Sequence, residues 1–349
     1  MTGSMPSCAV VMVNYRTPDE SIACIRSLVA ERENVPDLTV TLVDNASGDG
    51  SPDILALALS DLIADGFVTL LPLALNGGFG WANNQAILRL LATDARPDFV
   101  MVLNPDCIIE PGAIRALIDD MRDHPHGGAC GSLLLNPDGG KAGSAFRDHS
   151  IATEFVRGTR SHRIGRMLGL RPIFVDTDEP ADVAWVAGAA CLFRTAALEQ
   201  AGLFDDGFFL YFEEVELLHR LRQHGWSVRY VPTSRVMHIG GVSTGVRSGD
   251  GPSAKALPRY WFESRRRYLA RTSGAGTLFT ANIAWLVGDL IARVTSFLPP
   301  SRRRSFSGRG DRAQLLASGL TPRPQDAVDA IARVGDAPGA PPRWQSFKA

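Results

Sequence analysis

Cysteine and histidine are scarce in this sequence, and the few cysteines form no metal-binding pattern. The 349 residues hold five cysteines with no CxxC pair and no zinc-type spacing between them. This scatter argues against a zinc module, and we expect most of the thiols simply to be packed in a reducing cytoplasm. With only seven histidines, each well-placed imidazole deserves separate consideration.

An excess of charge of one sign is also lacking. Lys and Arg total 36, Asp and Glu total 37, and the formal net charge is −1. A chain so nearly neutral has no global basic field for nucleic acid. The short, polar start over residues 1–7 does not read as a signal peptide. With 45% hydrophobic and 21% charged residues, we expect a soluble protein with one large domain and an appendage.

Five apolar residues, 99–103, run without interruption and end at Asn104-Pro105-Asp106. Such a run predicts a strand buried on both faces of a parallel sheet, and proline must end it. Asp106 then lies at the carboxyl end of a central strand, where open α/β sheets bind ligands. Its carboxylate could hold a divalent cation, or it could merely cap the helix expected to start near Pro111.

Similar apolar runs at 8–13, 38–43 and 68–72 alternate with helical patterns that end near residues 30, 91 and 122. Regular alternation predicts a parallel sheet built from βαβ units. The four strands end in polar residues, and parallel strands place such ends along one edge of the sheet. We therefore expect Asn14, Asp44, Asn76 and Asp106 to lie side by side.

Glycines follow the third of these strands, at Gly77, Gly78 and Gly80. Glycine lets a backbone approach a phosphate or sugar closely. The pattern is not the dinucleotide fingerprint, which lies after a first strand. A tight connection between strand and helix explains the glycines equally well.

The second half is less regular. We expect strands at 129–135 and 227–231, a strand-like segment with small central residues at 184–194, and a loop-rich, mostly solvated region at 136–180. A helix starts at Glu213, Glu214 and Glu216 and stops at Gly225. The helix dipole alone favours acidic residues there, but the preceding aromatic run would raise the pKa of one carboxylate toward that of a general base. His238 lies in an apolar, glycine-flanked stretch that suits either a core residue or a ligand.

In this order and spacing, the motifs over residues 8–245 resemble the family 2 glycosyltransferases of the inverting GT-A fold, most closely their bacterial rhamnosyltransferase-like branch. The resemblance rests on the motifs Val13-Asn14-Tyr15, Val43-Asp44-Asn45, Asn76-Gly78-Phe79-Gly80, Leu103-Asn104-Pro105-Asp106, Trp185-Val186-Gly188-Ala189, Phe212-Glu213-Glu214-Val215 and His238. It implies a Rossmann-like, mixed but mostly parallel sheet flanked by helices, with a C-terminal helical extension.

The resemblance also implies roles for single residues. Glu214 would be the catalytic base, with Glu213 as the alternative, because the family usually has Asp at that position. Asp106 and His238 would hold Mg²⁺ or Mn²⁺, although Asn104 replaces the first carboxylate of the family's Asp-x-Asp motif. Trp185 and Gly188 would line the pocket for the acceptor or the donor sugar. The nucleotide-sugar would contact Asn14, Asp44, Asn76, Gly78, Asn84, Asn104 and Asp106.

The predicted activity is an inverting transfer of a sugar from a nucleoside diphosphate-sugar to a glycan or a polyprenyl-linked acceptor, in cell-surface polysaccharide synthesis. The resemblance favours rhamnose from dTDP-rhamnose. The alternatives are a UDP-sugar donor, a non-catalytic nucleotide-sugar binding module and a nucleotidyltransferase. The carboxylates Asp106 and Glu214 argue against a binding module, because binding alone does not need a base. A nucleotidyltransferase is disfavoured because residues 14–21 lack its basic, glycine-rich loop.

Three parts are expected: a catalytic domain at 1–245, a helical segment at 246–304 and a partly disordered tail at 305–349. Residues 278–298 are mostly apolar but include Asn282, Asp289 and Arg293. A spanning helix would resist these charges, so we expect an amphipathic helix in the membrane interface, with residues 265–267 and 302–304, all arginine, on anionic lipid. The alternative is a helical hairpin packed on the catalytic domain. If the helix lies in the membrane interface, we expect a cytoplasmic enzyme at the inner face of the cell membrane.

Overall fold

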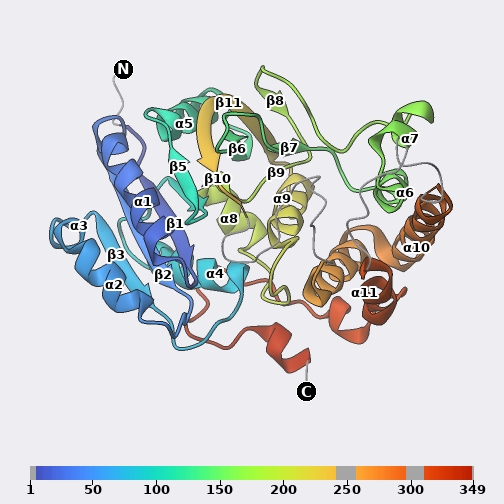
Figure 1. Ribbon diagram of the computed structural model, residues 1–349. Helices are drawn as coiled ribbons and strands as arrows, with labels where there is room; N and C mark the ends of the chain where they lie inside the picture. The colour runs from blue at the N-terminus through green and yellow to red at the C-terminus, as the bar shows by residue number, and fades with distance from the viewer. Residues whose placement is uncertain (1–4, 241–256, 296–309, 348–349) are drawn as a thin grey trace.

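The computed structural model describes residues 5–240, 257–295 and 310–347, and its centre is a mixed sheet flanked by helices (Figure 1). The strand order is β3-β2-β1-β4-β10-β6-β11-β5, with β8 paired to β11. The strands are β1 (Cys8–Asn14), β2 (Leu38–Asp44), β3 (Val68–Pro72), β4 (Phe99–Leu103), β5 (Cys107–Ile109), β6 (Gly127–Leu135), β8 (Ala181–Asp182), β10 (Ala190–Arg194) and β11 (Ser227–His238). A separate two-stranded sheet pairs β7 (Ala145–Phe146) with β9 (Trp185–Val186).

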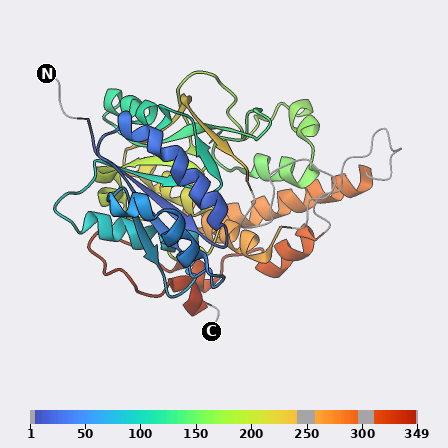
Figure 2. The same ribbon diagram turned by 60° about the vertical axis from the view of Figure 1, so that its left-hand side comes forward.

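Helices cover both faces of the main sheet, and others lie together at one end of the molecule (Figures 1 and 2). They are α1 (Pro18–Leu28), α2 (Ser51–Ala58), α3 (Ser60–Ala64), α4 (Phe79–Leu91), α5 (Ala113–Asp123), α6 (Ile151–Thr159), α7 (His162–Met167), α8 (Thr195–Ala201), α9 (Glu213–Gln223), α10 (Arg259–Thr295) and α11 (Asp311–Ser318). Alternate residues of β1 enter different cores, as a strand buried on both faces requires. Val10 and Met12 pack with α1, α2 and α5, and Val11 and Val13 pack with α4, α8 and α9.

The predicted row of four parallel strands is confirmed. β3, β2, β1 and β4 are neighbours and run parallel, with Asn14 in register with Asp44. The second half of the sheet departs from this pattern, because β10 runs antiparallel to both β4 and β6. The strand predicted at 227–231 extends through His238 as one strand, β11, whose register against β6 shifts between Val231 and Arg235.

The prediction that Asp106 might cap a following helix is wrong. β5 intervenes, and α5 begins only after Gly112. The backbone N–H groups of Gly112 and Ile114 donate instead to the carboxylate of Glu31. Asp106 is therefore free of that structural task.

The loop-rich description of residues 136–180 is also only partly right. Helix α6 starts with a capping box formed by Ser150 and Thr153, and it packs along α10. Gly158 and Gly288 are the contact points, because a Cβ on Gly158 would lie 2.2 Å from the carbonyl oxygen of Trp285, and one on Gly288 would lie 2.4 Å from that of Phe155. Figure 2 shows α6, α7 and the far half of α10 together at one end of the molecule.

The assignment of residues 265–267 to lipid binding is wrong, because all three arginines are buried in ion pairs. Arg265 lies 2.7 Å from Glu154 of α6, Arg266 lies 2.7 Å from Asp326, and Arg267 lies 2.8 Å from Asp205. These pairs join α10 to α6, to the C-terminal segment and to the loop between α8 and α9. Residues 302–304 lie outside the described residues.

The C-terminal segment, expected to be partly disordered, runs over the catalytic domain at residues 310–347. The backbone N–H of Leu203 donates to the carbonyl of Ala332, and that of Asp206 donates to the carbonyl of Ala330. The indole N–H of Trp81 donates to the carbonyl of Ala340 at 2.8 Å. The described part of the tail is thus tied to α4 and to the loop before α9.

Candidate active site

The ends of β1 and β2 are joined by a buried polar cluster. Asn14 Nδ2 donates to Asp44 Oδ1 at 2.7 Å, and the hydroxyl of Ser47 donates to the same oxygen at 2.6 Å. The backbone N–H of Ser47 donates to Asp44 Oδ2. Asn14 and Asp44 are almost fully buried, so these bonds fix the shape of the strand ends. A direct contact from Asn14 to a nucleotide would have to break them.

The glycine loop after β3 is held by the neighbouring strand end. Asn45 Nδ2 donates to Asn76 Oδ1 at 3.0 Å, and the backbone N–H of Gly77 donates to Asn45 Oδ1. Gly78 has φ +88°, and a Cβ there would lie 2.2 Å from the carbonyl oxygen of Phe209. Only glycine satisfies both conditions. The loop is thereby pressed against the aromatic segment that leads into α9.

Asn84 has a structural position in this arrangement. Its side chain is fully buried, donates to the carbonyl of Phe204 and to Asp206 Oδ1, and accepts from the backbone N–H of Phe204. It ties α4 to the loop after α8. Its predicted contact with the nucleotide-sugar stays a prediction.

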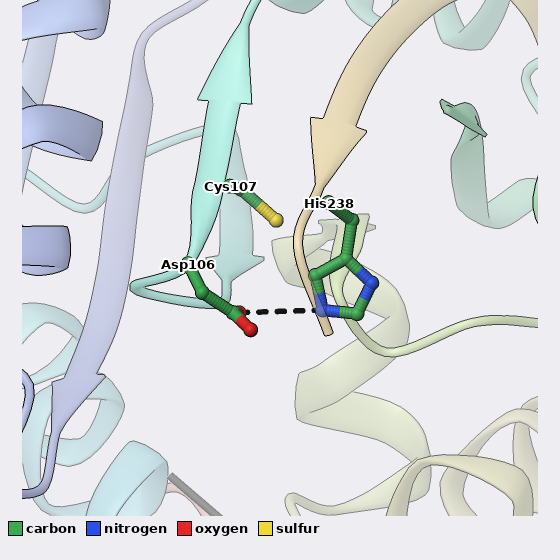
Figure 3. Close-up of side chains that lie close together, drawn as sticks. All are labelled: Asp106, Cys107 and His238. Carbon is green, nitrogen blue, oxygen red and sulfur yellow. Dashed lines mark ion pairs between the residues drawn. The ribbon is translucent and has the colours of Figure 1, made fainter. Parts of the chain in front are cut away.

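Asp106 and His238 face one another at the ends of β4 and β11 (Figure 3). His238 Nε2 lies 3.3 Å from Asp106 Oδ1, and the backbone N–H of Gly240 donates to Asp106 Oδ2. Asn104 Nδ2 lies 3.5 Å from the same imidazole nitrogen. Burial by itself raises the pKa of Asp106, but the hydrogen bond and charge of His238 outweigh it and hold the pKa below its usual value. Asp106 is therefore ionised at neutral pH.

A third potential ligand, the Cys107 thiol, lies beside this pair, and the ligand atoms of all three residues lie within 4.8 Å of one another. The thiol lies 3.5 Å from the carbonyl of Ala189, to which it donates, and burial raises its pKa well above the usual value. A protonated thiol is a poor ligand for a hard cation. The donors that suit Mg²⁺ or Mn²⁺ are thus one carboxylate and one imidazole. A hollow of ≈ 250 Å³ opens beside Asp106.

The two carboxylates that open α9 follow a strained piece of backbone. Tyr211 and Phe212 have φ of 69° and 70°, a left-handed conformation that costs free energy in non-glycine residues. Two such residues in succession turn the chain abruptly into α9. The strain sets the direction in which Glu213 and Glu214 leave the helix.

Glu213 and Glu214 differ sharply in access. Glu213 is 2% exposed, and its Oε2 has no hydrogen-bond partner among the described residues. Glu214 is partly exposed. Burial raises the pKa of both, and the neighbouring Glu214 raises that of Glu213 further. Glu214 is the carboxylate that a second molecule can reach.

Two adjacent residues connect Glu214 with the Asp106–His238 pair. A Cβ on Gly188 would lie 3.1 Å from Glu214 Cγ, so this glycine leaves room for the glutamate. The carbonyl of Ala189 accepts from the backbone N–H of Asn104 at 2.8 Å. Gly188 and Ala189 thus form a short link between the two groups, and that the predicted base and the predicted metal ligands line one site stays a prediction.

The pocket role predicted for Trp185 stays a prediction, and its ring is already in contact with other side chains. It stacks on Phe146 with centroids 3.7 Å apart and lies nearly parallel to His149 at 5.6 Å. Its indole N–H donates to the carbonyl of Arg147. At least one face of the ring is covered, so a sugar would meet its edge or its other face.

Two residues near the site escaped the sequence reasoning as functional positions. Asn45 holds the glycine loop through its hydrogen bonds with Asn76 and Gly77. The only sequence signal for this role is its position directly after Asp44. Trp344 donates its indole N–H to the carbonyl of Gly77 at 2.7 Å, and its ring meets Phe209 edge-on. Since 267 positions separate Trp344 from Gly77, no local pattern could reveal the contact.

Comparison with curated proteins extends these observations. The chain is 33% identical over 323 residues to an N-acetylglucosaminyl-diphospho-decaprenol L-rhamnosyltransferase of Mycobacterium tuberculosis. The aligned region covers 88% of this chain and 98% of the relative. It is 27% identical over 203 residues to the rhamnosyltransferase WbbL of Escherichia coli, over 56% of this chain and 70% of the relative.

Solved structures share the fold at low identity. A mannosyltransferase from Pyrobaculum calidifontis, solved with GDP-Man and Mn²⁺, matches with a TM-score of 0.53 at 15% identity, over 91% of this chain and 87% of that one. GalNAc-T7, solved with UDP, GalNAc and Mn²⁺, matches with a TM-score of 0.52 at 15% identity, over 76% and 48%. These matches confirm the predicted GT-A architecture. The sequence model of the family described as "Glycosyltransferase like family 2" matches residues 6–273. This chain is therefore a family 2 glycosyltransferase.

Proposed function

We propose that this enzyme transfers L-rhamnose from dTDP-rhamnose to a polyprenyl diphosphate-linked sugar, with inversion at the anomeric carbon. The observation that carries the proposal is that Glu214, a partly exposed carboxylate of raised pKa, lies against Gly188, one residue before Ala189, whose carbonyl accepts hydrogen bonds from Asn104 and Cys107 on either side of Asp106. The relatives named as rhamnosyltransferases support the sugar, and the decaprenol relative supports the acceptor. The nucleotide rests on the family resemblance.

The chain's own residues account for the proton transfer. Glu214 accepts the proton of the acceptor hydroxyl, whose oxygen forms a bond to the anomeric carbon. The bond from that carbon to the diphosphate oxygen breaks, and the diphosphate leaves with the electron pair. One displacement from the face opposite the leaving group inverts the configuration. Burial suits Glu214 to this task, because a raised pKa makes its carboxylate a stronger base.

Asp106 and His238 would hold a divalent cation, which stabilises negative charge on a leaving diphosphate when it is bound. Their fit rests on an ionised carboxylate and an imidazole 3.3 Å apart. A site with few protein ligands suits Mg²⁺, which keeps waters and substrate phosphate oxygens in its shell. The cation would therefore depend on the nucleotide for much of its coordination.

Calorimetric titration of dTDP, UDP and GDP, with Mn²⁺ present and then chelated, tests the donor site. We expect metal-dependent binding of dTDP that is lost in Asp106→Ala. Preferred binding of UDP would replace the proposed donor with a UDP-sugar. Failure of all three nucleotides to bind would overturn the proposal and leave a protein that has the family's fold without its chemistry.

A further inference from the structure

The outward face of the second half of α10 is apolar. Over residues 277–295 the exposed positions are Phe279, Thr280, Ile283, Val287, Leu290 and Val294. The five apolar ones recur every three or four residues and so form one stripe, about 22 Å long. Leu290 is 57% exposed and Val294 62% exposed. We call these five residues the apolar stripe.

The opposite face of the same helix segment carries the polar groups. Asn282 is fully buried and accepts from Arg265, and Asp289 is fully buried between Arg160 and Arg293. A helix on a water-exposed surface shows the reverse arrangement, with charges outward and apolar residues inward. A contiguous exposed apolar strip marks an interaction surface.

Basic side chains lie at the same end of the molecule. Helix α7 adjoins α6, which packs on α10 (Figures 1 and 2). Arg163, Arg166 and Arg171 are exposed there, and between them Met167 is 85% exposed and Leu168 58% exposed. Residues 155–175 contain no Asp or Glu. Exposed arginines beside large apolar residues suit an anionic lipid surface, and the acidic residues that follow this segment begin at Asp176.

We propose that the apolar stripe, with Arg163, Arg166 and Arg171, docks this enzyme on the surface of an anionic bilayer. The proposal goes beyond the sugar-transfer chemistry and does not depend on it. The stripe would enter the boundary between headgroups and acyl chains, and the positive charge of the arginines at the same end of the molecule would attract the anionic surface. Such a surface would present the active site to an acceptor that is itself held in the membrane.

Docking fits the structure better than spanning does. α10 is broken at Gly274, where φ of 81° is non-helical. It is the one helix in the described parts of the chain that is apolar enough over a sufficient length to cross a membrane, with mean hydropathy 1.4, but 39% of that segment is buried inside the protein. Its buried face holds Asn282 and Asp289, paired with arginines of this chain. Exposing those groups to lipid would cost several kilocalories per mole, so only the outward face is suited to contact lipid.

Sedimentation of the full chain with vesicles tests the proposal. We expect it to bind vesicles of phosphatidylcholine mixed with phosphatidylglycerol, and to bind pure phosphatidylcholine more weakly. The double variant Val287→Glu and Leu290→Glu should lower the partition coefficient about tenfold or more, because each apolar side chain contributes on that scale. The double variant Ile54→Glu and Leu57→Glu, which adds the same charge at exposed apolar residues of α2 (45% and 80% exposed), is the matched control and should bind normally.

A second measurement leaves the charge of the surface unchanged. All five native cysteines are buried, so a cysteine introduced by Leu290→Cys can be labelled selectively with an environment-sensitive fluorophore. Its emission should shift to shorter wavelength when anionic vesicles are added. The same label at Leu57→Cys should not respond.

The two experiments give separable outcomes. Absence of vesicle binding by the wild-type chain overturns the proposal, as does binding that survives in the Val287→Glu and Leu290→Glu variant. A chain that ignores vesicles but is dimeric by light scattering, and monomeric in that variant, would show that a second copy covers the stripe. Val287 and Leu290 are 45% and 57% exposed, so we expect the introduced glutamates to leave the fold intact, and equal thermal midpoints of the variants verify this.

Discussion

Gly188 lies directly against Glu214: a Cβ on the glycine would come within 3.1 Å of Cγ and 3.2 Å of Cβ of the glutamate. Substitution Gly188→Ala therefore pushes the glutamate side chain by a few tenths of an ångström. We expect kcat to fall several-fold, to about tenfold, since a misplacement of about 1 Å costs about a hundredfold. Donor affinity, measured by calorimetry, should change little.

The matched control for this substitution is Gly276→Ala. Gly276 has open space around its Cα and no left-handed φ. This variant should keep full activity. Equal rates for Gly188→Ala and wild type would show that Glu214 is not held by this contact.

The pH dependence of transfer follows from the burial of Glu214. Burial raises the pKa of this carboxyl, and the base acts only when ionised. Activity should therefore decline as the pH falls through the raised pKa, at a pH above the value of about 4.3 for an ordinary glutamate. The measurement is kcat across pH at saturating substrates. A decline of kcat only at about pH 4.3, the pKa of an ordinary glutamate, would contradict the assignment of Glu214 as the base.

The tail should contribute to donor binding through Trp344. Trp344→Phe removes the hydrogen bond to the carbonyl of Gly77 but keeps a ring beside Phe209. A lost hydrogen bond of about 1 kcal/mol would weaken binding of the donor nucleotide about fivefold through a looser glycine loop, with kcat nearly unchanged.

Trp226→Phe is the comparison, since this indole also donates a hydrogen bond, to Gln200 on the surface. Nucleotide affinity should be unaffected by it. If Trp344→Phe behaves in the same way, the tail does not support the donor loop.

The buried pair of Arg265 and Glu154 should matter greatly for stability. Arg265→Ala leaves the buried Glu154 carboxylate without its main partner, and such losses cost about 3–5 kcal/mol. Arg259→Ala breaks the exposed pair with Glu263, where about 0–1 kcal/mol is expected. Urea denaturation of both variants measures the difference. Similar losses in the two would show that the buried pair is not a strong link between α10 and α6.

Local sequence pattern predicts the first half of the fold well. Uninterrupted apolar runs identify β1 to β4, and a polar residue after each run locates the edge where Asp106 lies. The same reasoning fails for the arginines at 265–267, because a basic cluster looks the same whether it is exposed or buried in ion pairs. The partner Glu154 lies 111 positions from Arg265, so only the folded chain shows the pairing.

The candidate site shows the same division. The spacing of motifs identifies Asp106, Glu214 and His238, because each follows or opens an element with a clear pattern. Nothing local distinguishes Glu213 from Glu214, which are adjacent and equally acidic. Burial decides between them, since Glu213 is enclosed under Gly80 and Glu214 faces Gly188.

Comparison of Glu214→Gln with Glu213→Gln tests the central claim most directly. Each substitution removes one carboxylate at nearly constant volume, and the two positions are neighbours in one helix turn. Transfer should fall about a hundredfold or more in folded Glu214→Gln and remain near the wild-type rate in Glu213→Gln, with nucleotide binding retained in both. Wild-type transfer by Glu214→Gln, or its loss in Glu213→Gln alone, would contradict the account and move the base to Glu213 or elsewhere.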